Sequence, residues 1–268
     1  MRGYGRVVVA FSGGADSAFV LAAAVRALGP ADVVAATAVS PSLPTTELAA
    51  AAAFARGLGV RHETPSTAEL ERAGYRANAG DRCYFCKAEL LDTLRPLAGA
   101  LGIDVVATGT NADDAAAGFR PGIRAAAERR AATPLLDAGL TKAEVRAASR
   151  RWGLSTWDKP AAACLSSRVA YGVPVSSAAL ARVERAEVAT RAWLAEEGLA
   201  VRDLRVRDLG ASRARLEVDA ELVPALTDRA ADVRRVLVGA GFIDAQLDPR
   251  GFRSGAMNEL LPDPERWR

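Results

Sequence analysis

The fold is decided near the N-terminus, by the stretch Val7-Val8-Val9-Ala10-Phe11-Ser12-Gly13-Gly14-Ala15-Asp16-Ser17. Its apolar first half is typical of a short buried strand. A Ser-Gly-Gly turn follows, and an alanine-rich amphipathic run over residues 18–28 predicts a helix. Glycines let backbone N–H groups turn toward a ligand, and a helix N-terminus carries partial positive charge. The stretch therefore predicts an oxyanion cradle for a phosphate; the alternative is an ordinary strand-to-helix turn.

This cradle differs from two common phosphate-binding motifs. It lacks the Gly-Lys-Ser/Thr ending of a Walker A loop, and it lacks the G-x-G-x-x-G spacing of dinucleotide-binding folds. The six residues 12–17 instead resemble the PP-loop of ATP pyrophosphatases, which cleave ATP to AMP and pyrophosphate.

Composition limits the class of protein. The 268 residues are half hydrophobic and a quarter charged, enough for one large domain or two modest ones. No apolar run is long enough to span a bilayer, and residues 1–5 lead directly into the first strand, so we expect a cytoplasmic protein with no membrane partner. A net charge of +3 gives no sign of nucleic-acid binding. The excess of arginine over lysine is typical of a GC-rich genome.

Strands and helices alternate in the first part of the chain. Alternation of this kind predicts an α/β fold built on a doubly wound parallel sheet, with ligands beyond the carboxyl ends of the strands. The loop near Ser40 and the loop Gly109-Thr110-Asn111-Ala112-Asp113-Asp114 are expected at that edge. Asp113 and Asp114 are candidate Mg²⁺ ligands, unless they belong to a solvated turn. Further strands are expected over 31–39, 60–64 and 104–108, and a helix over 46–58.

Two segments carry the three cysteines, whose odd number argues against a secreted disulfide framework. In Arg82-Cys83-Tyr84-Phe85-Cys86-Lys87, both sulfurs lie at an expected helix start and can reach one metal. The alternatives are two buried apolar cysteines or a redox pair.

The third cysteine lies in Lys159-Pro160-Ala161-Ala162-Ala163-Cys164-Leu165-Ser166-Ser167-Arg168. Pro160 discourages a continuing helix, so we expect Cys164 on a loop. The flanking cations Lys159 and Arg168 are of the kind that lowers a thiol pKa and raises its reactivity. The alternative is a cysteine packed as a small hydrophobic residue.

The chain changes character after residue 172. We expect a domain over 1–172 and a smaller C-terminal α/β domain over 173–268. Arg205 and Arg207 can jointly hold a phosphate, for which the guanidinium fork is suited, unless they form a solvated strand face. In this part we expect helices over 177–197 and 222–240 and strands over 201–209, 214–218 and 242–247.

Five motifs together resemble one family. They are similar to those of the LarE family, the ATP-dependent pyridinium-3,5-biscarboxylic acid mononucleotide sulfurtransferases that help to make the nickel-pincer nucleotide cofactor of lactate racemase. One departure is Leu209-Gly210, which stands where the family usually carries a His-Gly pair. The motifs are, in order, residues 12–17, 82–87, 109–114, 159–168 and 205–207.

The resemblance implies a reaction and its site residues. A substrate carboxylate attacks the α-phosphate of ATP, pyrophosphate leaves, and sulfur then displaces AMP from the acyl-adenylate. Cys164 and Glu187 are implied as catalytic residues, and Arg168, Arg205 and Arg207 as ligands of the substrate phosphate. A homo-oligomer, a trimer or hexamer, is also implied. The residues implied for ATP and Mg²⁺ are Ser12, Gly13, Gly14, Asp16, Ser17, Gly109, Asn111 and Asp114.

The family uses two sulfur sources. In members with one cysteine, the residue matching Cys164 gives up its own sulfur and becomes dehydroalanine. In members with the extra C-x-x-C, three cysteines hold a 4Fe–4S cluster whose open iron binds hydrosulfide. Because this chain has Cys83, Cys86 and Cys164 and no others, we expect the cluster. A Cys₃His zinc site would need His62, the only histidine.

Three other functions compete with this one. A PP-loop tRNA thiolase is disfavoured because the chain has no evident RNA-binding module or strongly basic stripe. An NAD or GMP synthetase has no role for Cys164. A non-catalytic ATP sensor has no need of Asp16, Asp113 and Asp114.

Overall fold

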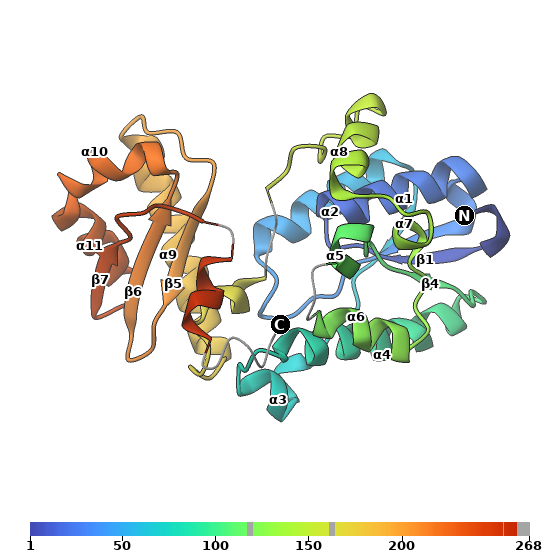
Figure 1. Ribbon diagram of the computed structural model, residues 1–268, viewed down its shortest axis with the longest axis horizontal. Helices are drawn as coiled ribbons and strands as arrows, with labels where there is room; N and C mark the ends of the chain where they lie inside the picture. The colour runs from blue at the N-terminus through green and yellow to red at the C-terminus, as the bar shows by residue number, and fades with distance from the viewer. Residues whose placement is uncertain (117–119, 161–163, 254, 262–268) are drawn as a thin grey trace. The chain divides into compact units, whose positions relative to one another are not determined.

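The computed structural model describes residues 1–116, 120–160, 164–253 and 255–261, so Ala161, Ala162 and Ala163 of the cysteine loop lie outside the described residues. The chain forms two compact units, each with its own sheet (Figure 1). Among the described residues, the first comprises 1–72, 81–116 and 120–160, and the second comprises 73–80, 164–253 and 255–261. The domain boundary expected at residue 172 stays a prediction.

The first unit is built on a four-stranded parallel sheet with the order β3-β2-β1-β4. The predicted α/β fold with a parallel sheet is therefore confirmed. β1 lies in the centre, between β2 and β4. The strands are β1 (Val7–Ala10), β2 (Val33–Ala36), β3 (Arg61–Glu63) and β4 (Val106–Ala107).

Side chains of β1 alternate between two apolar cores, one on each face of the sheet. Val7 and Val9 pack with α1, α2 and α8 on one face, and Val8 and Ala10 pack with α4 and α6 on the other (Figure 1). A central parallel strand is covered on both faces, which is why it reads as an unbroken apolar run. The helices are α1 (Ala15–Leu28), α2 (Thr45–Gly57), α4 (Arg82–Ala100), α6 (Pro121–Glu128) and α8 (Lys142–Arg151).

α8 begins with a capping box. The Thr141 hydroxyl accepts from the backbone N–H of Glu144 at 3.3 Å, and the Glu144 carboxylate accepts from the Thr141 N–H at 2.9 Å. The Thr141 hydroxyl, which donates to the Glu144 carboxylate at 2.7 Å, and the Thr141 N–H together lower the pKa of Glu144. The capping box fixes where the helix starts. The shorter elements of this unit are η1 (Arg2–Tyr4), η2 (Pro30–Asp32), η3 (Glu69–Glu71), α5 (Ala112–Ala116) and α7 (Pro134–Asp137).

The second unit has a three-stranded sheet with the order β5-β6-β7, antiparallel between β5 and β6 and parallel between β6 and β7. α9 packs on β5, and α11 packs on β7 and α9 (Figure 1). The elements are α3 (Ala73–Arg76), η4 (Leu165–Arg168), α9 (Ser177–Glu196), β5 (Leu204–Asp208), β6 (Arg213–Val218), η5 (Ala220–Leu222), α10 (Val223–Thr227), α11 (Ala230–Gly239), β7 (Asp244–Leu247) and η6 (Ala256–Leu260).

One expected helix is wrong as a single element. The run over 222–240 divides into α10 and α11, because the chain turns at Asp228 and Arg229. Pro224 lies in the first turn of α10, where its missing N–H costs nothing.

Asn78 ties the segment 73–80 to the rest of the second unit. Its amide donates to the carbonyls of Ala170 at 2.8 Å and Val173 at 2.9 Å, and it is fully buried. Its φ is +53°, a left-handed conformation that asparagine tolerates better than most residues. In the described part of the chain, no helix is both long and apolar enough to cross a membrane.

Truncation of Leu94 tests the core beneath β1. Leu94 on α4 is fully buried in the core that contains Val8. We expect Leu94→Ala to lower the free energy of unfolding by about 2–5 kcal/mol, measured by denaturant titration. Leu90→Ala removes a half-buried side chain of the same helix and should cost clearly less. Equal losses would contradict this packing.

Candidate functional site

The phosphate loop between β1 and α1 is braced by one hydroxyl. The Ser17 Oγ donates to the Gly14 carbonyl at 3.1 Å and accepts from the Ser12 N–H at 3.3 Å. Gly13 has a φ of +73°, which favours glycine. α1 starts at Ala15, so its first N–H groups lack intrahelical acceptors and can face an anion.

The loop after β4 lies directly against this phosphate loop. A Cβ on Gly109 would stand 2.8 Å from the backbone nitrogen of Ser17, so only glycine allows the approach. Beside it, the Asn111 amide donates to the Asp16 carboxylate at 3.2 Å. The loops that follow β1 and β4 therefore meet, as the carboxyl edge of a parallel sheet requires.

The acidic side chains at this edge have different partners. Asp113 accepts at 2.8 Å from the backbone N–H of Lys142, which is the first residue of α8, and so satisfies a backbone donor at the start of that helix. Asp114 donates its N–H to the Asn111 amide oxygen at 2.9 Å. Asp114 and Asp16 are thus joined through Asn111 and offer the oxygen ligands that Mg²⁺ prefers. Among the described residues, no three His, Cys, Asp or Glu side chains are grouped as a metal site.

Cys83 and Cys86 are the second and fifth residues of α4, about one turn apart, so they lie at a helix start as predicted. Cys83 is exposed and Cys86 is half-buried. Burial lowers the pKa of the adjacent Lys87, and the negative charges of Cys86, Cys83 and Asp114 oppose this shift. Lys87 therefore lies close enough to both thiols and to Asp114 to interact with their charges.

Two features of the first unit were absent from the sequence prediction. The hydroxyls of Ser40 and Ser42, after β2, both donate to the buried carboxylate of Glu69. Lys159 donates to the carbonyl of Gly13 at 3.0 Å and to the Glu47 carboxylate at 2.6 Å. The sequence showed Lys159 only as a neighbour of Cys164, because its partners lie more than a hundred residues away.

In the second unit, Arg168 connects the cysteine loop to α9. Its guanidinium donates to the Cys164 carbonyl at 3.0 Å and to the Glu187 carboxylate at 2.9 Å. Glu187 also accepts from the backbone N–H of Val206, the residue between Arg205 and Arg207. Cys164 precedes η4 in an extended conformation, which agrees with the expected loop.

The three arginines that were predicted to bind the substrate phosphate differ in the carboxylates that compensate their charges. Arg207 donates twice to the fully buried Glu217, at 2.6 and 2.9 Å, and once to the Ser167 carbonyl. Arg168 is paired with Glu187. For Arg205, burial and the charge of Arg168, with a contribution from Arg207, outweigh the attraction of Glu187 and lower its pKa to about 10. A buried guanidinium in a net positive environment is suited to bind an anion.

The structure therefore brings two groups of predicted site residues together, one in each unit. The three cysteines, by contrast, are distributed over both units. The phosphate loop meets Gly109, Asn111 and Asp114 in the first unit, and Cys164, Glu187 and the arginines meet in the second. Cys83 and Cys86 belong to the first unit and Cys164 to the second. The functional roles of all these residues stay predictions.

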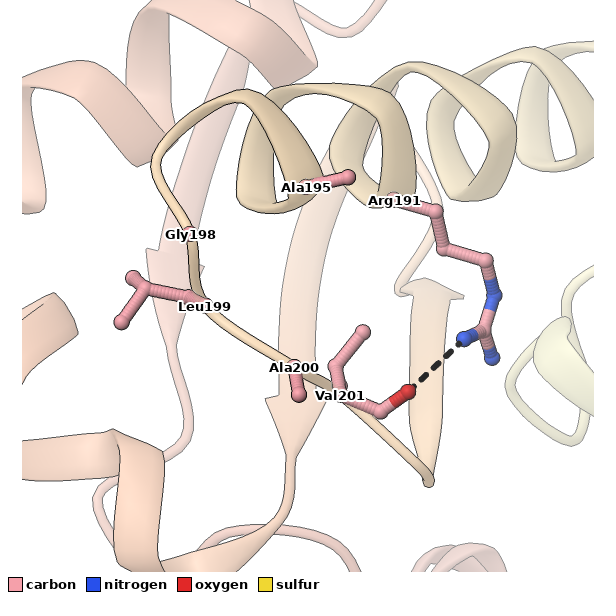
Figure 2. Close-up of a pocket in the computed structure, with 6 residues that line it drawn as sticks. All are labelled: Arg191, Ala195, Gly198, Leu199, Ala200 and Val201. Atoms are coloured by element: carbon pink, nitrogen blue, oxygen red, sulfur yellow. Dashed lines mark hydrogen bonds between the residues drawn. The ribbon is translucent and has the colours of Figure 1, made fainter.

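A cavity in the second unit lies apart from the predicted residues. It measures about 390 Å³ and lies between the end of α9 and the following loop (Figure 2). Arg191 extends along one side and donates to the Val201 carbonyl at 3.5 Å. The lining residues are Arg191, Ala195, Gly198, Leu199, Ala200 and Val201.

Gly109→Ala should separate the two loops at the sheet edge. Because the new Cβ would meet the Ser17 backbone at 2.8 Å, we expect a misplaced phosphate loop and about a 100-fold loss of ATP-dependent turnover. Gly99→Ala on α4 meets nothing within 4 Å and should stabilise the protein by about 0.5–1 kcal/mol. Full activity of the Gly109 variant would contradict the close approach.

Substitution of the arginines should separate structural from binding charges. Arg207→Gln leaves the buried Glu217 with Arg215 as its remaining cation, so we expect a loss of about 3 kcal/mol of unfolding free energy. Arg205→Gln removes a guanidinium that donates to the Leu204 carbonyl at 2.7 Å and lies over the Phe252 ring, but it leaves the Glu217 pair intact and should cost less stability than Arg207→Gln. It should also weaken inorganic phosphate binding about ten- to a hundredfold. Thermal unfolding with and without phosphate measures both, and equal destabilisation would contradict the assignment.

Comparison with known proteins indicates the family to which the chain belongs. A family model described as NAD synthase matches residues 1–89, which include β1 and the phosphate loop. The chain is 42% identical to an uncharacterised protein of Synechocystis sp., over 96% of this chain and 93% of the relative. It is 33% identical to the pyridinium-3,5-bisthiocarboxylic acid mononucleotide synthase of Lactiplantibacillus plantarum, over 96% of this chain and 90% of that protein. With these motifs and this near-complete coverage, the chain belongs to the LarE family of PP-loop enzymes, to which that synthase also belongs.

Proposed function

We propose that this enzyme is an ATP-dependent sulfurtransferase acting on pyridinium-3,5-biscarboxylic acid mononucleotide. It converts a carboxylate of this substrate to a thiocarboxylate, with AMP and pyrophosphate as products. The Lactiplantibacillus plantarum relative, a pyridinium-3,5-bisthiocarboxylic acid mononucleotide synthase, supports this class of product. The role is a step in biosynthesis of the nickel-pincer nucleotide cofactor.

The observation that carries the proposal is the connection between Cys164 and the arginines. Arg168 holds the Cys164 carbonyl, and Glu187 joins Arg168 to the strand that bears Arg205. A substrate phosphate bound at Arg205 would therefore be anchored next to the cysteine that handles sulfur. An amide-forming synthetase has no need of this connection.

The reaction proceeds in two displacements. A carboxylate oxygen of the substrate attacks the α-phosphorus of ATP, and the bond to the β-phosphate oxygen breaks with its electron pair leaving on pyrophosphate. Hydrosulfide sulfur then attacks the acyl carbon, and the carbon–oxygen bond breaks to release AMP. The phosphate loop binds the nucleotide phosphates, with Mg²⁺ near Asp114, and the arginines hold the substrate phosphate.

For the sulfur source, we propose a 4Fe–4S cluster on Cys83, Cys86 and Cys164. The chemistry of the donors supports the proposal, because Cys83 and Cys86 project from neighbouring turns of one face of α4, and three thiolates would leave one iron open. When bound, the cluster supplies an iron that can take up hydrosulfide. The alternative is donation of the Cys164 sulfur itself, which would leave dehydroalanine.

Pyrophosphate release tests the reaction. With the full chain, ATP and Mg²⁺, we expect pyrophosphate only when pyridinium-3,5-biscarboxylic acid mononucleotide is added. Release with tRNA instead would favour the thiolase, and release with neither would contradict both. The expected cytoplasmic location and homo-oligomeric state stay predictions.

Anaerobic purification tests the sulfur source. We expect iron and inorganic sulfide in equal amounts in the wild type and their loss in Cys83→Ala. The intact mass of the wild type should stay unchanged after turnover with hydrosulfide. Loss of hydrogen sulfide from Cys164, or activity of Cys83→Ala equal to that of an iron-free wild type, would contradict the cluster and support the sacrificial route.

A further inference from the structure

Lys159 brings a full positive charge to the phosphate loop. Its ammonium donates to the Gly13 carbonyl at 3.0 Å and to Glu47, in the first turn of α2, at 2.6 Å. Its own carbonyl accepts from Arg146 on α8 at 2.9 Å, so the backbone is held as well. The side chain is mostly buried, with 22% exposed.

The phosphate loop contains no basic residue between Ser12 and Ser17. Its own attraction for anions comes from N–H groups and from the partial charge at the start of α1. A triphosphate carries several negative charges, and a nearby ammonium is a compact partner for them. Among the described residues, Gly13 and Glu47 account for two of the three N–H donors of Lys159, so the third can reach a ligand.

The placement of lysine in this chain supports the same conclusion. Only three of its 35 basic residues are lysines, and all three lie in the first unit. Lys142 lies 3.6 Å from Asp16 of the phosphate loop, and Lys159 contacts Gly13 of the same loop. In a chain that otherwise uses arginine, two of the three lysines therefore lie beside the predicted site of the nucleotide phosphates.

We propose that Lys159 binds phosphate oxygens of ATP during adenylation, and that Glu47 is its positioning residue. This inference rests on the proposed function for the identity of the carboxylate substrate, but not for nucleotide binding. Lys159 compensates the negative charge that accumulates as the bond between the α- and β-phosphates breaks, and it transfers no proton. Its ammonium keeps its bonds to Gly13 and Glu47 while it contacts the phosphate.

Lys159→Gln is the direct test, because the amide can still donate to Gly13 while the charge is lost. We expect the affinity for ATP to fall about tenfold and pyrophosphate release to fall about 100-fold. Titration calorimetry with ATP, AMP and pyrophosphate identifies the contact, since a loss for AMP indicates the α-phosphate and a loss for pyrophosphate alone indicates the leaving group. Unchanged binding of all three ligands together with unchanged turnover would overturn the proposal.

Glu47→Gln separates binding from a merely structural ion pair. It removes a negative charge near the bound phosphates while keeping an acceptor for Lys159, so the affinity for ATP should rise or stay the same. If the ion pair only holds the fold, both variants should lose stability and affinity alike, which would also overturn the proposal. Arg56→Met, at the exposed end of α2, is the matched control for charge and should match the wild type.

The two proposals can fail separately. If wild-type protein binds ATP and Lys159→Gln does not, the inference stands even when the pyridinium nucleotide releases no pyrophosphate. If the pyridinium nucleotide is a substrate and Lys159→Gln turns it over at the wild-type rate, only the inference fails.

Discussion

The backbone contact between Gly109 and Ser17 is the constraint on which the first unit depends. Parallel strands place their carboxyl ends at one edge, but they do not decide how closely the following loops approach. Here no side chain fits between the two backbones, and Asn111 is therefore brought within hydrogen-bond distance of Asp16. Asp114 follows through its bond to Asn111, so one missing Cβ sets the geometry of the whole acidic edge.

The two units carry different cations at their candidate anion sites. In the first unit, Lys142 and Lys159 lie beside the phosphate loop, and their compact charges would suit a flexible polyphosphate with a metal ion. The second uses arginines on a buried strand, where the planar fork can be fixed by carboxylates such as Glu187 and Glu217. Around Arg205, burial and the neighbouring charges of Arg168 and Arg207 lower the pKa of the guanidinium to about 10. An anion bound there, as proposed, would favour the charged form.

Much of the first unit could be predicted from the sequence, because its signals are local. The apolar run of β1, the Ser-Gly-Gly turn and the capping box of α8 each lie within a few residues. The bond of Lys159 to Gly13 spans 146 residues, and no local pattern contains such information. The same holds for Glu217, whose place beside Arg207 follows from the register of β5 and β6. The break between α10 and α11 was missed because a periodic apolar pattern continues across it.

The main chain of Cys164, and not its sulfur, is what the second unit holds in place. Its carbonyl accepts from the Ser167 N–H at 3.0 Å, from the Ser167 hydroxyl at 2.7 Å and from Arg168 at 3.0 Å. A carbonyl with three donors keeps its position when the side chain changes, since none of these bonds involves the thiol. The contacts that hold Arg168 beside Cys164 are thus independent of the thiol. If the arginines bind the substrate phosphate as proposed, a variant without the Cys164 sulfur should retain that site, so that loss of turnover in such a variant reports on sulfur transfer and not on substrate binding.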